Sequence, residues 1–91
     1  MRSDQNPNPE TRFHNLTYQD QLDAVWQQGH LLVTRQIPGF WLHLYAVNTF
    51  FVEIWICQRT YTVTLLRVLN QPNDLDPYLY FVQLSLHELL P

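Results

Sequence analysis

The sequence has one cysteine, two glycines, two serines and no lysine, and each shortage excludes a class of function. Cys57 alone cannot form a disulfide within the chain, whereas secreted domains of this size usually contain several. Neither serine has a neighbouring base for serine hydrolysis. Two glycines are too few for the glycine-rich loops that bind phosphates or dinucleotides. These shortages predict a cytoplasmic protein without a nucleotide cofactor.

Charge is scarce as well: charged residues make up 14% of the 91 residues, and the formal net charge is -3. Nucleic-acid binding draws its affinity from clustered Lys and Arg, and the five arginines here are scattered along the chain. We therefore expect no nucleic-acid partner. So little charge on a small domain also weakens its protection against self-association.

Long apolar runs are interrupted. The stretch from Ile37 to Cys57 is long enough to cross a bilayer as a helix, but Pro38, Gly39 and Glu53 lie within it. The polar N-terminus also lacks the apolar centre of a secretory signal. The sequence predicts no membrane segment.

What is present indicates a single α+β domain over residues 16–91, preceded by a flexible polar tail at 1–15. Thr17 and Asp20 have the spacing of a helix cap, and Gly29 is placed to end that helix in a left-handed conformation. The apolar residues of this helix recur on one side: Tyr18, Leu22, Val25 and Trp26.

Four strands with short connections follow, and they predict an antiparallel meander. The expected strands cover residues 30–36, 40–47, 50–57 and 61–69. Pro38-Gly39 is typical of the centre of a type II turn. A C-terminal helical segment is expected to begin near Asp74 to Asp76, and beyond Gln83 the pattern fits a helix or an edge strand.

The connection between the expected strands 40–47 and 50–57 determines which of their residues share a sheet face. A change of one residue in its length moves the side chains of one strand to the opposite face. A three-residue loop, Asn48-Thr49-Phe50, would sort aliphatic from aromatic side chains, and we therefore expect it. The aliphatic face would contain Leu42, Leu44, Ala46, Val52, Ile54 and Ile56. The opposite face would contain Trp41, His43, Tyr45, Phe51, Glu53, Trp55 and Cys57.

Three short pieces, "AVWQQG", "FFVEIW" and "LDPYL", resemble small uncharacterised bacterial proteins of the kind found in Bacteroidetes. The resemblance runs from Ala24 to Leu79. It implies an α+β fold and assigns no activity or site.

The expected aromatic face is the candidate functional surface, since exposed apolar patches with polar rims mark partner or ligand sites. Its interface or ligand residues are Trp41, His43, Tyr45, Phe51, Glu53 and Trp55. Three occupants are open: the helices of the same chain, a second copy in a homodimer, or a small apolar ligand. A non-catalytic, self-associating interaction domain is the favoured function.

A thiol enzyme is the catalytic alternative. On the expected register His43 is diagonal to both Cys57 and Glu53, which would allow a relay of nucleophile, base and orienting carboxylate. The four histidines show no metal-ligand spacing, so no metal site is expected.

Overall fold

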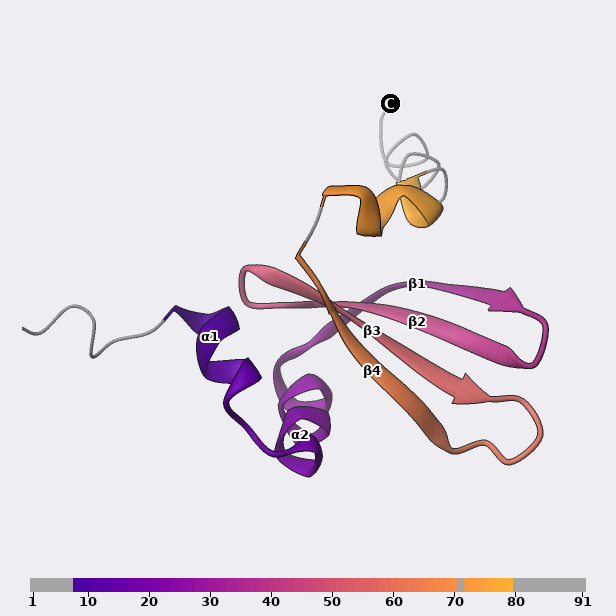
Figure 1. The fold of residues 1–91 in the computed structure, drawn as a ribbon, viewed down its shortest axis with the longest axis horizontal. Helices are drawn as coiled ribbons and strands as arrows, with labels where there is room; N and C mark the ends of the chain where they lie inside the picture. The colour runs from indigo at the N-terminus through magenta and orange to yellow at the C-terminus, as the bar shows by residue number, and fades with distance from the viewer. Residues whose placement is uncertain (1–7, 71, 80–91) are drawn as a thin grey trace, which may run out of the picture.

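The computed structural model describes residues 8–70 and 72–79 of the chain. Its elements are the helices α1 (Pro9–His14) and α2 (Tyr18–Gln28), the strands β1 (His30–Ile37), β2 (Phe40–Val47), β3 (Phe50–Cys57) and β4 (Val63–Leu69), and the 3₁₀ turn η2 (Pro72–Leu75) (Figure 1). Residues 76–79 are helical, and with η2 they form the C-terminal segment, residues 72–79. The antiparallel sheet has the order β1-β2-β3-β4, which confirms the predicted α+β class and meander.

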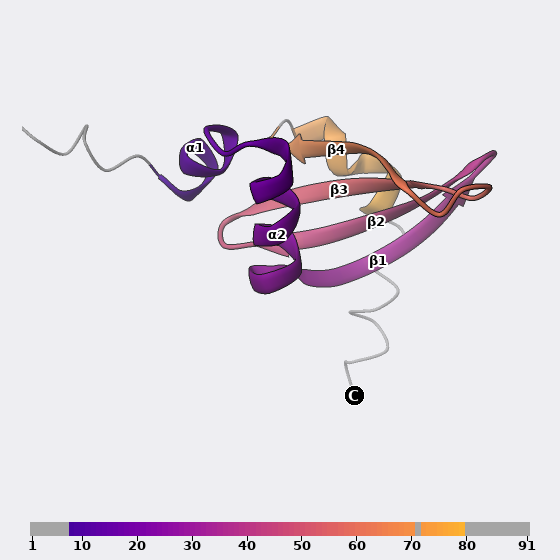
Figure 2. The ribbon, with the colours of Figure 1, turned by 90° about the horizontal axis from the view of Figure 1, so that it is seen from below.

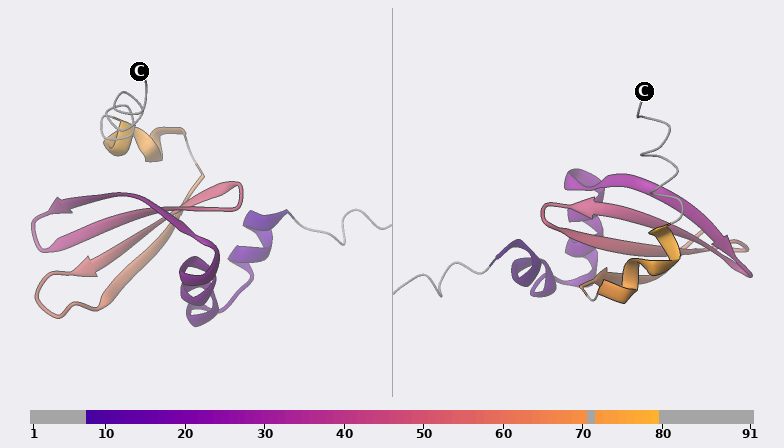
Figure 3. Two further views of the ribbon diagram at one scale, coloured as in Figure 1. Left: turned by 180° about the vertical axis from the view of Figure 1, so that it is seen from behind. Right: turned by 90° about the horizontal axis from the view of Figure 1, so that it is seen from above.

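The sheet is the middle of three layers. Figure 2 shows α1 and α2 on one face of the sheet and the C-terminal segment on the other, and Figure 3 shows the same arrangement from two further sides. Two buried clusters correspond to these layers. The larger lies between the helices and the sheet, and the smaller surrounds Tyr78 of the C-terminal segment.

The first residue of α2 and the side of the helix that is buried are as the sequence predicts. The Thr17 hydroxyl accepts a hydrogen bond from the Asp20 backbone N–H at 3.2 Å, and Leu22 and Val25 are buried against the sheet. The end of the helix differs, because Gly29 is extended (φ -82°) and not left-handed. Glycine is needed there for space: a Cβ atom would lie 2.6 Å from the Val25 carbonyl oxygen.

Helix α1 lies within the region expected to be a flexible tail. The Asn8 side chain accepts from the Thr11 N–H at 2.8 Å and caps the helix, with Pro9 in its first turn. Phe13 is only 4% exposed, and its ring centroid lies 5.2 Å from that of Phe50. A buried aromatic contact therefore fixes this short helix on the sheet, although residues 1–15 were expected to bury almost nothing.

The predicted register between β2 and β3 is wrong. Val47 pairs with Phe50, so the connection has two residues, and Asn48 takes the left-handed conformation (φ 53°) that asparagine tolerates better than most residues. His43 consequently pairs with Ile54 and not with Trp55. Apolar residues of β2 and β3 therefore lie on both faces of the sheet.

We name the two faces by what covers them. The helix face carries Thr34, Gln36, Trp41, His43, Tyr45, Val47, Phe50, Val52, Ile54, Ile56, Val63, Leu66 and Val68. The C-terminal face carries Val33, Arg35, Ile37, Phe40, Leu42, Leu44, Ala46, Phe51, Glu53, Trp55, Cys57, Leu65, Arg67 and Leu69.

Candidate functional site

The six residues proposed for one aromatic surface lie on two faces. Trp41, His43 and Tyr45 are on the helix face. Phe51, Glu53 and Trp55 are on the C-terminal face, because the two-residue turn shifts β3 by one position relative to the expected register. The contiguous patch predicted from the sequence is therefore not formed.

The same shift separates the members of the predicted thiol relay. Cys57 and Glu53 lie on the C-terminal face, whereas His43 lies on the helix face. Hydrogen bonds from the Thr60 hydroxyl and backbone, then from the backbone of Arg59, lower the pKa of the Cys57 thiol. The imidazole that would act as base is on the far side of the sheet, so the relay does not assemble.

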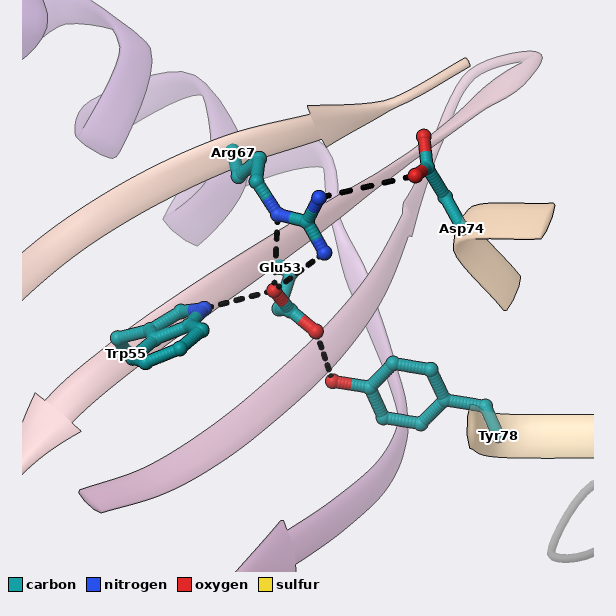
Figure 4. A network of polar contacts seen from close by, with 5 residues as sticks. All are labelled: Glu53, Trp55, Arg67, Asp74 and Tyr78. Carbon is teal, nitrogen blue, oxygen red and sulfur yellow. Dashed lines mark hydrogen bonds and ion pairs between the residues drawn. The ribbon is translucent and has the colours of Figure 1, made fainter. Parts of the chain in front are cut away.

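Glu53 is instead the centre of a buried polar network (Figure 4). Its side chain is 1% exposed. One carboxylate oxygen accepts from the Trp55 indole N–H at 2.6 Å and from Arg67 Nε at 3.2 Å. The other oxygen accepts from the Tyr78 hydroxyl at 2.5 Å. A buried carboxylate needs such donors, since an uncompensated buried charge is costly.

The network fastens the C-terminal segment to the sheet. Arg67 also lies 3.6 Å from Asp74, and Leu75 packs with the cluster around Tyr78. Burial, followed by the hydrogen bond to Glu53, raises the pKa of the Tyr78 phenol above its usual value of 10. The Arg35 guanidinium lies over the Tyr78 ring, 4.9 Å from the ring centroid. The C-terminal segment thus covers the middle of this face.

The outer half of the helix face has no such cover among the described residues. Its half-buried or exposed residues form what we call the Trp41 surface: Thr34, Gln36, Trp41, His43, Ile56, Tyr61 and Val63. On the inner side of this surface the Tyr45 ring packs edge-on against Trp26 of α2 at 5.7 Å. Beyond that pair, the two hairpins extend outward past the helices (Figure 1).

An aromatic stack forms the centre of the Trp41 surface. The rings of Trp41 and Tyr61 lie 5.5 Å apart with an interplanar angle of 28°. Tyr61, in the turn between β3 and β4, is 72% exposed and takes a left-handed conformation (φ 58°). That conformation is strained for a bulky side chain, and glycine would adopt it more easily.

His43 is the titratable group of this surface. Its Nδ1 lies 2.7 Å from the Thr34 hydroxyl, and its ring lies beside Tyr45. Partial burial lowers the pKa of the imidazole, which favours the neutral form at physiological pH.

The distribution of charge distinguishes the two faces. The four strands contain three residues with a formal charge, Arg35, Glu53 and Arg67, and all three lie on the C-terminal face. The helix face of the strands is therefore uncharged when His43 is neutral.

Three residues of these sites were not predicted from the sequence: Tyr61, Arg67 and Tyr78. Arg67 pairs directly across from Glu53. Tyr78 meets Glu53 from 25 positions away, a distance over which sequence periodicity gives no signal. Tyr61 was expected to begin the fourth strand, and it lies instead in the connection between β3 and β4.

Comparison with protein-family models, curated proteins and solved structures finds no significant match to this chain. Within residues 8–70 and 72–79, no helix has the length and apolar character needed to span a membrane. The same residues contain no group of three or more His, Cys, Asp or Glu side chains arranged to hold a metal ion.

Proposed function

We propose that this chain is a small, non-catalytic interaction domain that forms a homodimer through the Trp41 surface. The observation that carries the proposal is the stack of Trp41 and Tyr61 on the outer half of the helix face, which the described residues leave uncovered. A strained backbone persists when something else depends on it, and binding surfaces are a common reason. Aromatic anchors of this kind also dominate the energetics of protein interfaces.

The absence of charge on the helix face of the strands favours a second copy as the partner. A two-fold interface brings each residue close to its own counterpart or to a neighbour of it, so like charges near the axis repel. Here the residues near such an axis would be neutral and largely aromatic or β-branched. A charged partner would find no formal charge to pair with on the helix face of the strands.

The thickness of the layers also suits a second copy. α2 lies across the inner half of the helix face (Figure 2). Packed sheets lie about 10 Å apart, close to the thickness of one helix layer. Two chains related by a two-fold axis can therefore stack their outer halves, with the hairpins of each reaching toward α2 of the other.

Sedimentation velocity of the full chain tests the proposal. A transient interface of modest size is expected, and we therefore predict a weak dimer with a Kd of roughly 10 to 100 µM. The weight-average sedimentation coefficient should rise across that range. Monomer at every concentration refutes the proposal.

Tyr61→Gly is the informative variant, because it separates the proposed contribution of the ring to the dimer from the effect of the left-handed backbone on stability. Removing the ring should weaken the dimer at least about fivefold, as expected for an interface aromatic. The free energy of unfolding should be unchanged or higher, since glycine relieves the left-handed strain. Leu65→Ser, on the C-terminal face and 41% exposed, is the matched control and should leave the dimer unaffected.

A further inference from the structure

The outer turns of the two hairpins form one joined end of the sheet. We call it the hairpin end and define it as residues 36–42 and 55–65. Figure 1 shows the two turns at the same end of the sheet, away from α1. The Gln58 backbone N–H donates to the Gly39 carbonyl oxygen at 3.0 Å, and the Gln58 side-chain amide donates to the Phe40 carbonyl oxygen at 3.1 Å. The hairpin end is therefore a single structural unit.

Apolar side chains lie on both sides of the hairpin end. The stacked rings of Trp41 and Tyr61 are on the helix face, and Ile37 and Phe40 are on the C-terminal face. All four side chains are half-buried or exposed. A protein docked on one face of the sheet would cover only half of them, whereas a lipid interface surrounds an inserted hairpin from both sides. The two-sided arrangement therefore favours lipid as the partner.

The formal charge of the hairpin end is positive. It contains Arg59 and no other residue with a formal charge. Arg59 is exposed and forms no salt bridge with any residue that the structure describes. The acidic residues Glu10, Asp20 and Asp23 belong to α1 and α2, beyond which the hairpins extend (Figure 1). Although the net charge is -3, this distribution turns the hairpin end toward an anionic surface.

We propose that the hairpin end attaches the protein to the surface of an anionic membrane. The rings of Phe40, Trp41 and Tyr61 would lie in the interfacial region, with Arg59 among the headgroups. Trp and Tyr concentrate in that region because their rings are apolar and carry one polar atom. A strand rises about 3.3 Å per residue, so the residues next to the turns match the depth of about 5 to 10 Å reached by interfacial attachment.

The membrane contact and the proposed homodimer are separate proposals that share Trp41 and Tyr61. A chain bound to lipid through these rings is therefore monomeric. Lipid binding is measured at a protein concentration well below the expected dimer Kd, and the dimer is measured without lipid. Failure of one proposal consequently does not decide the other.

Flotation of the full chain with lipid vesicles tests the membrane contact. Vesicles of phosphatidylcholine and phosphatidylserine should carry the protein, with half of it bound at lipid concentrations on the order of millimolar. Vesicles of phosphatidylcholine alone should bind about fivefold more weakly, which is the contribution of one arginine near an anionic surface. Equal binding to both vesicles would overturn the choice of an anionic surface. The absence of flotation at millimolar lipid would overturn the membrane contact itself.

Two pairs of variants identify the residues responsible. Ile37→Ser should weaken vesicle binding about threefold, because the half-buried side chain has only part of its surface left to bury in lipid. Leu31→Ser, near the other end of β1 and 53% exposed, is the matched control and should have no effect. Arg59→Gln should remove the preference for phosphatidylserine, whereas Arg59→Lys should retain it because the charge remains. The proposal is overturned if the two members of either pair behave alike.

Discussion

Tyr78 donates a 2.5 Å hydrogen bond to the buried carboxylate of Glu53, and this contact joins the C-terminal segment to the centre of the sheet. Both side chains are nearly inaccessible to water, with Tyr78 at 0% and Glu53 at 1% exposure. The pair explains why a carboxylate lies among Phe51, Ile54 and Trp55: its partners come from other parts of the chain.

Tyr78→Phe should destabilise the fold by about 1 to 3 kcal/mol, because one oxygen of a buried carboxylate loses its donor. Urea unfolding followed by tryptophan fluorescence measures the change. Tyr61→Phe is the control, since its hydroxyl belongs to an exposed side chain, and it should alter stability by less than about 0.5 kcal/mol. Equal losses in the two variants would show that the hydrogen bond to Glu53 adds little.

Glu53→Gln should cost roughly 2 kcal/mol, because the neutral amide is a weaker acceptor for Arg67 and adds a donor where donors already converge. Solvent reaches Arg67, whose side chain is 44% exposed, and this limits the loss. Combined with Tyr78→Phe, the two losses should be less than additive, since they disrupt one network. Strict additivity in a double-mutant cycle would contradict a coupled network.

The two glycines should respond differently to substitution. Gly29→Ala should destabilise by about 1 to 3 kcal/mol, because the new Cβ meets the Val25 carbonyl oxygen. Gly39 has open space around it but a left-handed backbone (φ 89°), so the cost of Gly39→Ala is conformational. Asparagine tolerates that conformation and should recover part of the loss at Gly39 but none at Gly29. Thermal unfolding of the Ala and Asn variants at both positions measures these differences in stability. A more stable Gly29→Asn than Gly29→Ala would contradict the prediction.

The stability of the fold should fall as the pH drops below about 6.5, the usual pKa of histidine. Burial lowers the pKa of His43 in the folded state, so the unfolded chain takes up the proton first. The stabilising effect of the neutral imidazole is therefore complete above the unfolded pKa and is lost as the pH falls toward the folded one. His43→Gln should flatten the slope of unfolding free energy in the pH range just below about 6.5. If the pH dependence of the unfolding free energy is the same in His43→Gln, titratable groups other than His43 cause it.

Much of the fold was predictable because its signals are local. The Thr17 cap, the spacing of Leu22 and Val25 and the Pro38-Gly39 turn each indicated the correct element, and all four predicted strands are present. The cap of α1 was equally local, with Asn8 followed by Pro9, but it was overlooked in a polar stretch.

The register failed for a physical reason. Sorting aliphatic from aromatic residues assumes that one face is covered and the other is partly hydrated. Here α2 and the C-terminal segment cover parts of opposite faces, so both need apolar residues and no sorting is required. The left-handed preference of Asn48 favoured the two-residue turn and was the better guide.

The most direct test of the proposed homodimer is an isotope-filtered NOE measurement on a sample that mixes ¹³C-labelled and unlabelled chains above the dimer Kd. The account predicts intermolecular NOEs from the rings of Trp41 and Tyr61 to the methyl groups of Ile56 and Val63. Intermolecular NOEs confined to Leu31 and Leu32 on the edge strand β1, or to the C-terminal face, would contradict it.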